Sequence, residues 1–588
     1  MSPATSDSDQ PAGRNRLSGF DGLLKNLALA GRTVRALALA TLPAQPGSLG
    51  AFVERNAART PDHPALLFEG HRWTWAQVDE VANRVAQWFL ARGARSGDVV
   101  ALALGSRPET VFALAGLNKI GVIAALPHAG VRGGPLRHAL ASVAPRWVLA
   151  APWNVLDVRD ASEAELIVWD DGFRDALGAA DTASPGSAHV QPGDAVALYM
   201  FTSGTTGLPK AARITNRRFT LMSLGFAHTI GALRPGDVTY CALPLSHATG
   251  TMGGLGGVAA AGTTLALRDG FSTSAFWSDC VAYGATVVPY IGEVCRFLLQ
   301  APENPDEHRH RVRLFYGAGL RHDVWIAFQE RFRVPEIVEY YGSTEGNVAL
   351  VNVEGVPGMI GRLNFGQSVV RVDPETAEPI RDAHGHVTEA AEGEPGMLIG
   401  RISALTRFDG YTDHAATEKK ILRDAFGDGH DWFATGDLVV RHHGNFLSFS
   451  DRLGDTYRWK GENVSTAQVA DVLVRASGVR EAIVYGVTVP RHEGRAGMAA
   501  LVTDPGFDPA RFAAEVAAQL PRASRPVFLR ILETPDLTAS FKYVTTRFKQ
   551  EGFDPHTVAD PLWIASGDGY ERLTPEVHHR LLAGAIRL

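Results

Sequence analysis

The residues with the clearest chemical potential lie at 202–210, TSGTTGLPK, directly after the apolar run 197–201. The apolar run predicts a short buried strand, and the glycines, hydroxyls and lysine after it predict a loop. Glycines permit backbone angles that let successive N–H groups converge on an anion. A plain surface turn is the alternative. The residues predicted to hold phosphates are Thr202, Ser203, Gly204, Thr205, Thr206, Gly207 and Lys210.

The P-loop of kinases and ATPases does not fit this stretch. That motif, GxxxxGK[ST], needs a second glycine and a final hydroxyl that holds magnesium. Counted from Gly204, Pro209 stands in the glycine position, and Ala211 follows Lys210. The stretch instead resembles the phosphate loop of the ANL superfamily of adenylate-forming enzymes.

A second motif, EYYGSTEGN at 339–347, resembles the ANL segment that contacts adenine, the α-phosphate and magnesium. By position, the resemblance implies that Tyr341 packs on adenine, Thr344 bonds the phosphate and Glu345 holds the ion, with Gly342 and Ser343 in the same nucleotide-binding segment. Magnesium prefers one or two carboxylates together with phosphate oxygens, which agrees with this assignment. A solvated loop acid is the alternative for Glu345.

Two further segments complete the predicted nucleotide site. A predicted strand ends in Gly317, Ala318 and Gly319, where small residues would let a flat base approach the backbone, as relatives seat adenine. A carboxylate can accept both ribose hydroxyls, and an arginine can contact ribose or phosphate. TGD at 435–437 is by itself only a turn signal, but the ANL resemblance implies that Asp437 binds ribose and that Arg452, which closes the large domain in relatives, binds the nucleotide.

An acyl pocket is predicted beside the nucleotide. The small residues of 250–262 would leave space there, and the stretch 290–299 would border an acyl tunnel. His247 falls on the motif that flanks the acyl substrate in relatives, although a structural histidine is the plainer alternative. His247 and Tyr290 are therefore the predicted substrate-binding residues.

The stretch 451–465, DRLGDTYRWKGENVS, resembles the signature of the fatty acid transport protein and very-long-chain acyl-CoA synthetase branch, and most closely its bacterial FadD-type members. Runs at 290–293, 408–411 and 418–420 support the resemblance, which covers about residues 50–570. It implies that Trp459, Lys460 and Gly461 guide coenzyme A, and that Lys542 is the adenylation lysine. An uncoupled surface lysine is the alternative for Lys542, because the residues around it depart from the pattern.

Alternating helix and strand patterns from residue 49 predict an α/β fold. We expect a large multi-sheet domain at 49–453, in which helices pack on largely parallel sheets, and a small mobile α+β domain at 454–588. Gly454 aligns with the hinge of relatives, and glycine would permit a large change in backbone angles. Residues 1–48 are predicted to form a tail and a basic amphipathic helix at 20–42, which would lie on an anionic membrane or pack on its own domain.

The composition fits a soluble multidomain protein. The chain has 588 residues, 45% of them hydrophobic, and a net charge of −6, which gives no electrostatic case for nucleic acid. Three cysteines without metal-site spacing favour a reducing compartment. No apolar run of about 18 residues occurs. We expect a cytoplasmic protein, peripheral on the inner face of the membrane if residues 20–42 bind lipid.

These features predict a long- or very-long-chain fatty acid:CoA ligase that uses ATP, Mg²⁺ and coenzyme A. The acid would attack ATP to give an acyl-adenylate and pyrophosphate, and the thiol would then form acyl-CoA. Two alternatives stay open: a fatty acid uptake protein that acts by metabolic trapping or lipid binding, and an acyl-AMP ligase that loads a carrier protein.

Overall fold

The computed structural model describes residues 47–186, 191–203, 208–373, 376–404, 406–453, 456–460, 462–492, 494–534, 545–567, 569–586 and 588. Several predicted features lie outside these residues, namely the amphipathic helix at 20–42, Gly204, Thr205, Thr206, Gly207, Gly454, Gly461 and Lys542.

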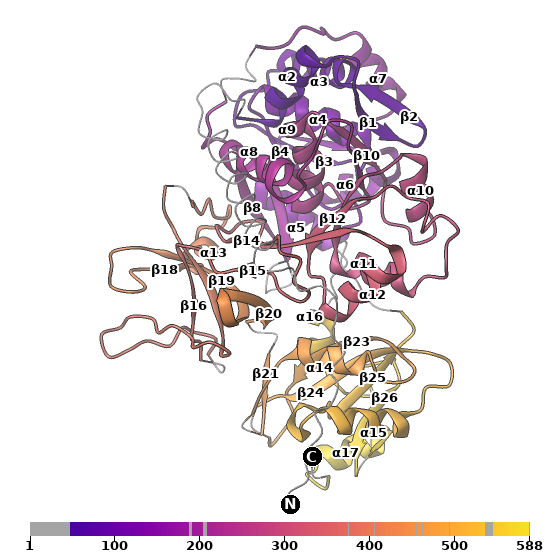
Figure 1. The fold of residues 1–588 in the computed structure, drawn as a ribbon, viewed down its shortest axis with the longest axis vertical. Coiled ribbons are helices and arrows are strands. Elements are labelled where there is room, and N and C mark those ends of the chain that lie inside the picture. The colour runs from indigo at the N-terminus through magenta and orange to yellow at the C-terminus, as the bar shows by residue number, and fades with distance from the viewer. Residues whose placement is uncertain are drawn as a thin grey trace, which may run out of the picture.

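Two largely parallel sheets form the centre of the N-terminal part (Figure 1). In the first, all neighbouring strands are parallel except the two edge strands β2 and β14. In the second, only the β7–β8 pair is antiparallel. The first sheet has the order β14 (Ala349–Asn352), β13 (Glu336–Gly342), β12 (Leu314–Ala318), β11 (Val287–Ile291), β9 (Val238–Cys241), β10 (Thr264–Leu267), β1 (Pro64–Phe68), β2 (His71–Thr74). The second has the order β6 (Glu165–Val168), β5 (Trp147–Ala150), β3 (Val99–Ala103), β4 (Ile123–Leu126), β7 (Val196–Ser203), β8 (Pro209–Thr215).

Helices cover these sheets, so that strands such as β4, β5 and β10 are buried along their whole length. The predicted helix–strand alternation is thereby confirmed. The α-helices are α2 (Leu49–Arg59), α3 (Trp75–Ala91), α4 (Pro108–Lys119), α5 (Gly133–Val143), α6 (Val155–Ala161), α7 (Asp171–Gly178), α8 (Asn216–Leu224), α9 (Gly257–Ala261), α10 (Phe276–Ala282), α11 (Gly292–Gln300) and α12 (His322–Phe332). A 3₁₀ turn, η1 (Pro152–Asn154), and two π-helical segments, η2 (Gly225–Ile230) and η3 (Thr249–Gly256), complete the set.

The glycine-rich stretch 250–262 differs from its prediction. It forms η3 and α9, and all eight residues of η3 are buried. A Cβ on Gly250 would lie 2.3 Å from the carbonyl oxygen of Pro244, and one on Gly256 would lie 2.2 Å from Oγ of Ser223. The prediction that these small residues leave open space is wrong at both positions, because they allow close packing instead.

A third, antiparallel sheet lies to one side of the first two and is orange in Figure 1. Its strands follow the order β15 (Gly361–Arg362), β20 (Phe446–Arg452), β19 (Trp432–Arg441), β17 (Pro395–Arg401), β16 (Gln367–Val370), with β18 (Ile421–Leu422) paired to β19. Helix α13 (His414–Glu418) and the turn η4 (His443–Asn445) belong to the same region.

The C-terminal unit, yellow in Figure 1, is α+β as predicted and has its own hydrophobic core. Ser465 is the N-cap of the helix that begins at Thr466, since its Oγ accepts the N–H of Gln468 at 3.3 Å. Its sheet has the order β23 (Val479–Val487), β24 (Ala496–Thr503), β25 (Phe528–Leu532), β26 (Leu562–Ser566), β27 (Gly569–Arg572), and a separate hairpin joins β21 (Tyr457–Trp459) to β22 (Glu462–Val464). Its helices are α14 (Thr466–Leu473), α15 (Pro509–Gln519), η5 (Arg522–Ser524), α16 (Thr545–Glu551) and α17 (Pro575–Leu582).

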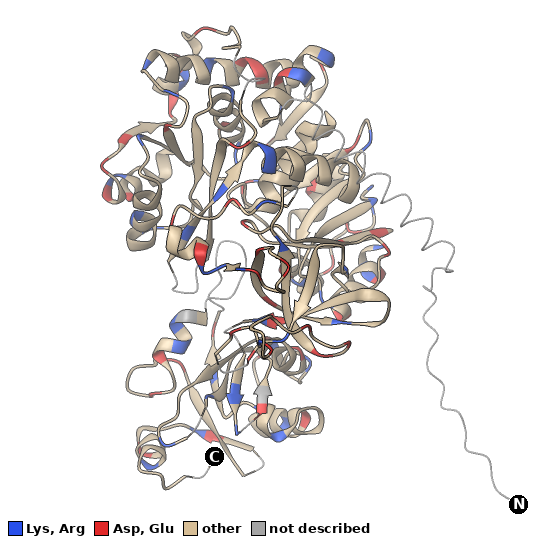
Figure 2. Cartoon of the chain, turned by 90° about the vertical axis from the view of Figure 1, so that its left-hand side faces the viewer, with Lys and Arg blue, Asp and Glu red and all other residues tan. Residues whose placement is uncertain are grey.

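Charged residues are scattered over all parts of the ribbon in Figure 2. Cys241, Cys280 and Cys295 are buried and form no disulfide. Among the described residues, no helix is both long and apolar enough to cross a membrane.

Candidate functional site

The predicted adenine and ribose residues meet at the ends of two sheets. The Tyr341 hydroxyl, near the end of β13, donates a hydrogen bond of 2.6 Å to Oδ2 of Asp437 on β19. The β19–β20 register places Arg452 opposite Asp437, with its Nε 3.5 Å from Oδ1. Burial, together with the Asp437 charge, raises the pKa of Tyr341 well above its ordinary value. The hydroxyl therefore stays protonated and fixes the carboxylate beside the arginine.

Glu345 lies in the turn that follows β13, four residues after Tyr341, and is half-buried. Its Oε1 accepts a 2.6 Å hydrogen bond from the hydroxyl of Tyr411, a buried residue that the sequence did not mark as functional. Burial and the charge of Glu345 raise the pKa of Tyr411, so the hydroxyl is a donor at neutral pH. Tyr411 is held against the phosphate strand β8, because a backbone bridge pairs it with Ala212.

The turn that carries Thr344 is anchored on both sides. Oγ of Ser343 accepts the N–H of Gly346 at 3.0 Å, and Arg218 of α8 donates to the Ser343 carbonyl oxygen at 3.0 Å. A Cβ on Gly346 would lie 2.1 Å from the Ser343 hydroxyl oxygen, so only glycine permits this turn. Arg218 has a pKa lowered by burial, an effect that the charges of Asp409 and Glu345 oppose.

The glycines predicted to admit adenine have a packing role as well. A Cβ on Gly317 would lie 2.2 Å from the carbonyl oxygen of Tyr290 on the adjacent strand, so strand packing alone requires glycine there. Gly319 has a φ of +85°, which favours glycine, and Ala318 is half-buried. Gly342 is exposed, and nothing lies closer than 3.6 Å to a Cβ built on it. Its backbone is therefore open to a ligand.

A buried carboxylate, Glu339, supports the same loop and was not predicted as a functional residue. Its Oε1 accepts the N–H groups of Gly319 at 2.5 Å and Leu320 at 3.1 Å, while Oε2 accepts the hydroxyl of Tyr290. Burial raises the pKa of Glu339 to about 8, against the opposing effect of these hydrogen bonds. Tyr290 is fully buried in this arrangement, and the acyl contact predicted for it stays a prediction.

Strands β7 and β8 bring the described phosphate-loop residues together. Their register pairs Thr202 with Lys210 and Ser203 with Pro209, and Oγ1 of Thr202 lies 3.5 Å from the Lys210 carbonyl oxygen. Lys210 acts electrostatically on Lys420, a second lysine that the sequence did not single out. Both cations therefore belong to the region of Glu345 and Asp437.

The other predicted contact residues lie elsewhere. His247 precedes η3, and its Nδ1 accepts the N–H of Thr249 at 3.3 Å. Trp459 is 2% exposed in the C-terminal core, where its ring packs on His492 at 5.5 Å. Lys460 has a φ of +51° and donates to the carbonyl oxygen of Leu588 at 2.5 Å. None of these three contacts involves a nucleotide-site residue.

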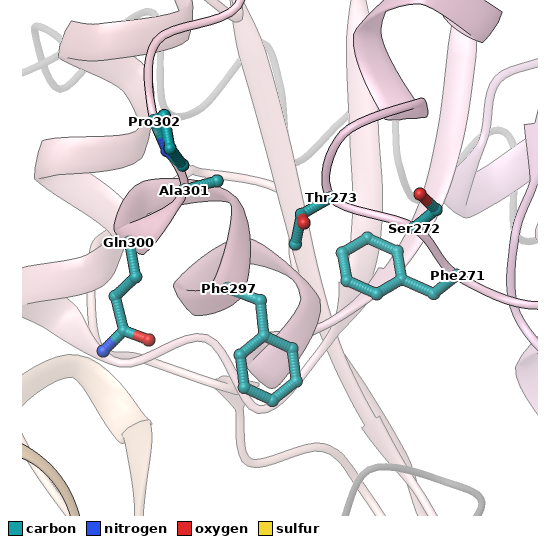
Figure 3. Close-up of a pocket in the computed structure, with 7 residues that line it drawn as sticks. All are labelled: Phe271, Ser272, Thr273, Phe297, Gln300, Ala301 and Pro302. Carbon is teal, nitrogen blue, oxygen red and sulfur yellow. The ribbon is translucent and has the colours of Figure 1, made fainter.

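Two hollows touch the stretches predicted to border the acyl tunnel. One, of about 460 Å³, includes Phe297 of α11, which faces Phe271 across a centroid separation of 6.3 Å (Figure 3). The other, of about 410 Å³, includes Ala260, Ala261 and Gly262 of the glycine-rich stretch. The two hollows share no lining residue and hold none of the nucleotide-site residues named above.

The C-terminal unit is attached close to the site through Asp451, the residue before Arg452. Its Oδ2 accepts the N–H of Thr466 at 2.7 Å and the hydroxyl of Ser465 at 3.0 Å, at the N-terminus of α14. Ion pairs join the two parts as well, with Arg321 2.9 Å from Asp471. Asp451 thus links the strand that carries Arg452 to the first helix of the C-terminal unit.

Comparison with known proteins places this geometry in a family. The AMP-binding enzyme family matches residues 53–403, and the AMP-binding enzyme C-terminal domain matches residues 468–542. Long-chain fatty acid transport protein 1 of Mus musculus is 40% identical over 563 residues, which cover 90% of this chain and 87% of that protein. Medium/long-chain-fatty-acid–CoA ligase FadD6 of Mycobacterium tuberculosis is 38% identical over 538 residues, or 90% of each chain.

The fold agrees with these matches. The crystal structure of ATP-bound MatB from Rhodopseudomonas palustris has a TM-score of 0.73 at 22% identity, and the alignment covers 85% of this chain and 98% of that one. The resemblance predicted from the motifs is confirmed. Because the first family match alone spans more than half of its length, the chain belongs to the AMP-binding enzyme family of the ANL superfamily.

Proposed function

We propose that this protein is a long- or very-long-chain fatty acid:CoA ligase, an ATP-dependent AMP-forming acyl-CoA synthetase. The observation that carries the proposal is the group of Tyr341, Asp437 and Arg452, which strands of two different sheets bring together, with Glu345 in the turn that follows β13. It unites an aromatic ring, two carboxylates and a cation, the groups needed to bind a base, a ribose, a metal and phosphates.

The substrate class rests on the relatives. Proteins named for long-chain fatty acid transport and for medium/long-chain fatty acid–CoA ligation are similar to this chain over nine-tenths of its length. A ligase would also promote uptake, because converting the acid to its CoA ester traps it, so the transport alternative is compatible with the same chemistry. The acyl-AMP ligase alternative differs in its second step, where a carrier protein replaces coenzyme A.

Magnesium fits the residues around Glu345. Tyr411 occupies one carboxylate oxygen, and the other makes no hydrogen bond within the described part of the chain. No group of three or more His, Cys, Asp or Glu residues in that part could hold a metal by itself. This suits an ion that takes one or two protein carboxylates and completes its shell with phosphate oxygens and water. When bound, the ion would neutralise charge on the phosphates.

In the first half-reaction, a carboxylate oxygen of the fatty acid attacks the α-phosphorus of ATP. The new O–P bond forms as the bond to the bridging oxygen breaks, and pyrophosphate leaves with the electron pair. Asp437 and Arg452 would hold the ribose, and the 202–210 loop the departing phosphates. The Thr344 hydroxyl has no partner among the described residues, so it is available to the α-phosphate, where it and Lys542 would stabilise developing charge.

In the second half-reaction, the sulfur of coenzyme A attacks the acyl carbon, and AMP leaves. We expect the C-terminal unit to rotate about Gly454 between the two steps. This rotation would withdraw Lys542 and bring the loop with Trp459, Lys460 and Gly461 to the adenylate. Because Trp459 packs inside the C-terminal core, the unit would carry it as one body.

The proposal is tested by pyrophosphate release from ATP and Mg²⁺ with a series of fatty acids of increasing length, with and without coenzyme A. We expect release that requires an acid, gives acyl-CoA when the thiol is present, and falls at least 100-fold in Lys542→Ala. Lys419→Ala, at an exposed lysine, is the control that should keep full activity.

Other outcomes would favour other functions. Acyl-adenylate that accumulates despite coenzyme A, yet is transferred to a carrier protein, would identify an acyl-AMP ligase. Lipid binding without pyrophosphate release for any acid would overturn the enzyme and leave a binding or transport role.

A further inference from the structure

Lys420 lies between α13 and β18, the strand that pairs with β19. Its Nζ donates a hydrogen bond of 2.8 Å to the carbonyl oxygen of Thr435. A Cβ built on Gly436 would be 3.2 Å from the same nitrogen, so the ammonium lies against the backbone of β19 at Thr435 and Gly436. The next residue of this strand is Asp437, which accepts the hydrogen bond from Tyr341.

The ammonium is poorly compensated. It is a half-buried cation with three donors, of which one is used by Thr435, and among the described residues no carboxylate lies within 4.0 Å of it. Its other close partner is the ring of Phe433, 5.8 Å from Nζ. Burial lowers the pKa of Lys420, an effect that Glu345 and Asp437 only partly offset. A partly buried charge of this kind gains from an added anion.

The surrounding charges indicate which anion that would be. Four charged residues act on Lys420, and all four belong to the proposed nucleotide site: Glu345, Asp437, Lys210 and Arg452. The two carboxylates are themselves engaged, Glu345 by Tyr411 and Asp437 by Tyr341. Lys420 therefore lies within electrostatic range of the residues predicted to bind the metal, the ribose and the phosphates.

We propose that Lys420 is a nucleotide-binding residue whose ammonium contacts the phosphate chain of ATP. The inference rests on the proposed function, because it places ATP among these residues. The Thr435 contact holds the lysine stem in place, and the remaining N–H donors bind phosphate oxygen. Lys420 thus contributes more to the binding of ATP than to the binding of adenosine.

A purely structural role makes a different prediction. If Lys420 only supported the backbone of β19 at Thr435 to Asp437, its loss would disturb the ribose contact and weaken adenosine and ATP equally. Lys420→Gln separates the two roles, since glutamine keeps a donor for the Thr435 carbonyl without the charge. Lys420→Met removes both, and Lys420→Arg restores the charge. The adjacent Lys419 is exposed and provides a matched control, Lys419→Met.

The test is isothermal titration calorimetry of the full chain with MgATP, AMP and adenosine. We expect Lys420→Gln and Lys420→Met to weaken ATP binding about 10- to 100-fold and adenosine binding less than about 2-fold, with Lys420→Arg in between and Lys419→Met unchanged. Thermal unfolding midpoints show whether the variants fold. One folded variant that lacks the charge is enough to test the assignment of Lys420.

Equal weakening of ATP and adenosine, or unchanged ATP affinity in the uncharged variants, would overturn the assignment of Lys420 and leave the ligase intact. A wild-type protein that binds no ATP would overturn the proposed function itself and this inference with it.

Discussion

Two lysines in this molecule are removed from water, yet their surroundings differ. Lys119, at the end of α4, is fully buried, and its ammonium lies 2.6 Å from Oδ1 of Asp79 and 2.5 Å from Oδ1 of Asn83. Lys420 has one backbone carbonyl as its hydrogen-bond partner. Lys119 is part of a completed network inside the protein, whereas Lys420 completes its contacts only when an anion arrives.

The comparison teaches how burial should be interpreted. Burial alone does not tell whether a charged side chain has a structural or a functional role. The number of its hydrogen-bond and ionic partners does. Removing one member of a buried ion pair destabilises the fold, mainly because the other charge is left buried without a partner. A buried charge without an ionic partner lowers the stability of the free protein, and an anion that binds to it raises that stability again. We therefore expect substitution of Lys119 to reduce mainly the stability of the fold, and substitution of Lys420 to reduce mainly the affinity for ATP.

The largest expected effect is on stability. Lys119→Met leaves Asp79 and Asn83 without their partner, and we expect the free energy of unfolding to fall by about 3–5 kcal/mol. Lys420→Met should change it by less than about 1 kcal/mol, since no ion pair is lost. Urea titrations of both variants measure the difference. Similar losses in the two variants would remove the distinction between the lysines.

The second effect is on nucleotide affinity. Asp437→Asn keeps one carbonyl oxygen that can accept the Tyr341 hydroxyl, but it loses the charge beside Arg452 and one of the two acceptor oxygens. We expect ATP and adenosine to bind about 10- to 50-fold more weakly, both to the same extent, because the ribose is common to the two. Titration calorimetry tests this, with Asp428→Asn, at an exposed residue, as the control. A loss confined to ATP would place Asp437 on the phosphates instead.

The third effect concerns the metal. Glu345→Gln removes the charge that would hold magnesium, so the Mg²⁺ concentration for half-maximal adenylation should rise roughly tenfold. Tyr411→Phe removes only the hydrogen bond that orients Glu345, and a rise of about 2- to 3-fold is expected. Pyrophosphate release measured against Mg²⁺ gives both numbers. An unchanged Mg²⁺ requirement in Glu345→Gln would exclude it as a ligand.

The smallest expected effect is a pH dependence of stability, and it extends the comparison of buried lysines to a buried acid, Glu339. The folded-state pKa of Glu339 is about 8, above the ordinary 4.5, so its contribution to stability is full below pH 4.5 and is lost as the pH rises to 8. Between pH 7 and pH 8 the loss is roughly 1 kcal/mol. Glu339→Gln keeps an acceptor for Gly319 and Leu320 and should lack this loss in urea titrations at the two pH values. An equal loss in the variant would assign it to another group.

Much of this architecture was predictable from the sequence, for a physical reason. Parallel strands covered on both faces are short apolar runs, as β3 and β10 are, and such runs between helical patterns led to the predicted α/β fold. The antiparallel sheet that carries Asp437 was not predicted, because its strands pair across long polar segments and follow no helix–strand alternation.

Site residues could be predicted where the residue type itself indicates a chemical role. They could not be predicted where the role depends on packing in the folded structure. Tyr341, Glu345 and Asp437 were predicted from motifs, and in the structure Tyr341 is hydrogen-bonded to Asp437. Nothing in the doublet Lys419–Lys420 shows that the first lysine is exposed and the second lies in the site. Likewise, the full burial of Tyr290 follows from its pairing with Gly317 across two strands distant in sequence.

The position of Asp451 has a thermodynamic consequence. Asp451 of β20 accepts the N–H of Thr466 at the start of the first helix of the C-terminal unit, and the next residue, Arg452, lies 3.5 Å from Asp437, the proposed ribose residue. If nucleotide occupancy shifts that arginine, it must bias where the helix rests. By reciprocity, a change in the resting place of the helix must alter nucleotide affinity by the same factor. In that case β20 alone couples the release of the nucleotide product to the position of the C-terminal unit, without any additional signalling element.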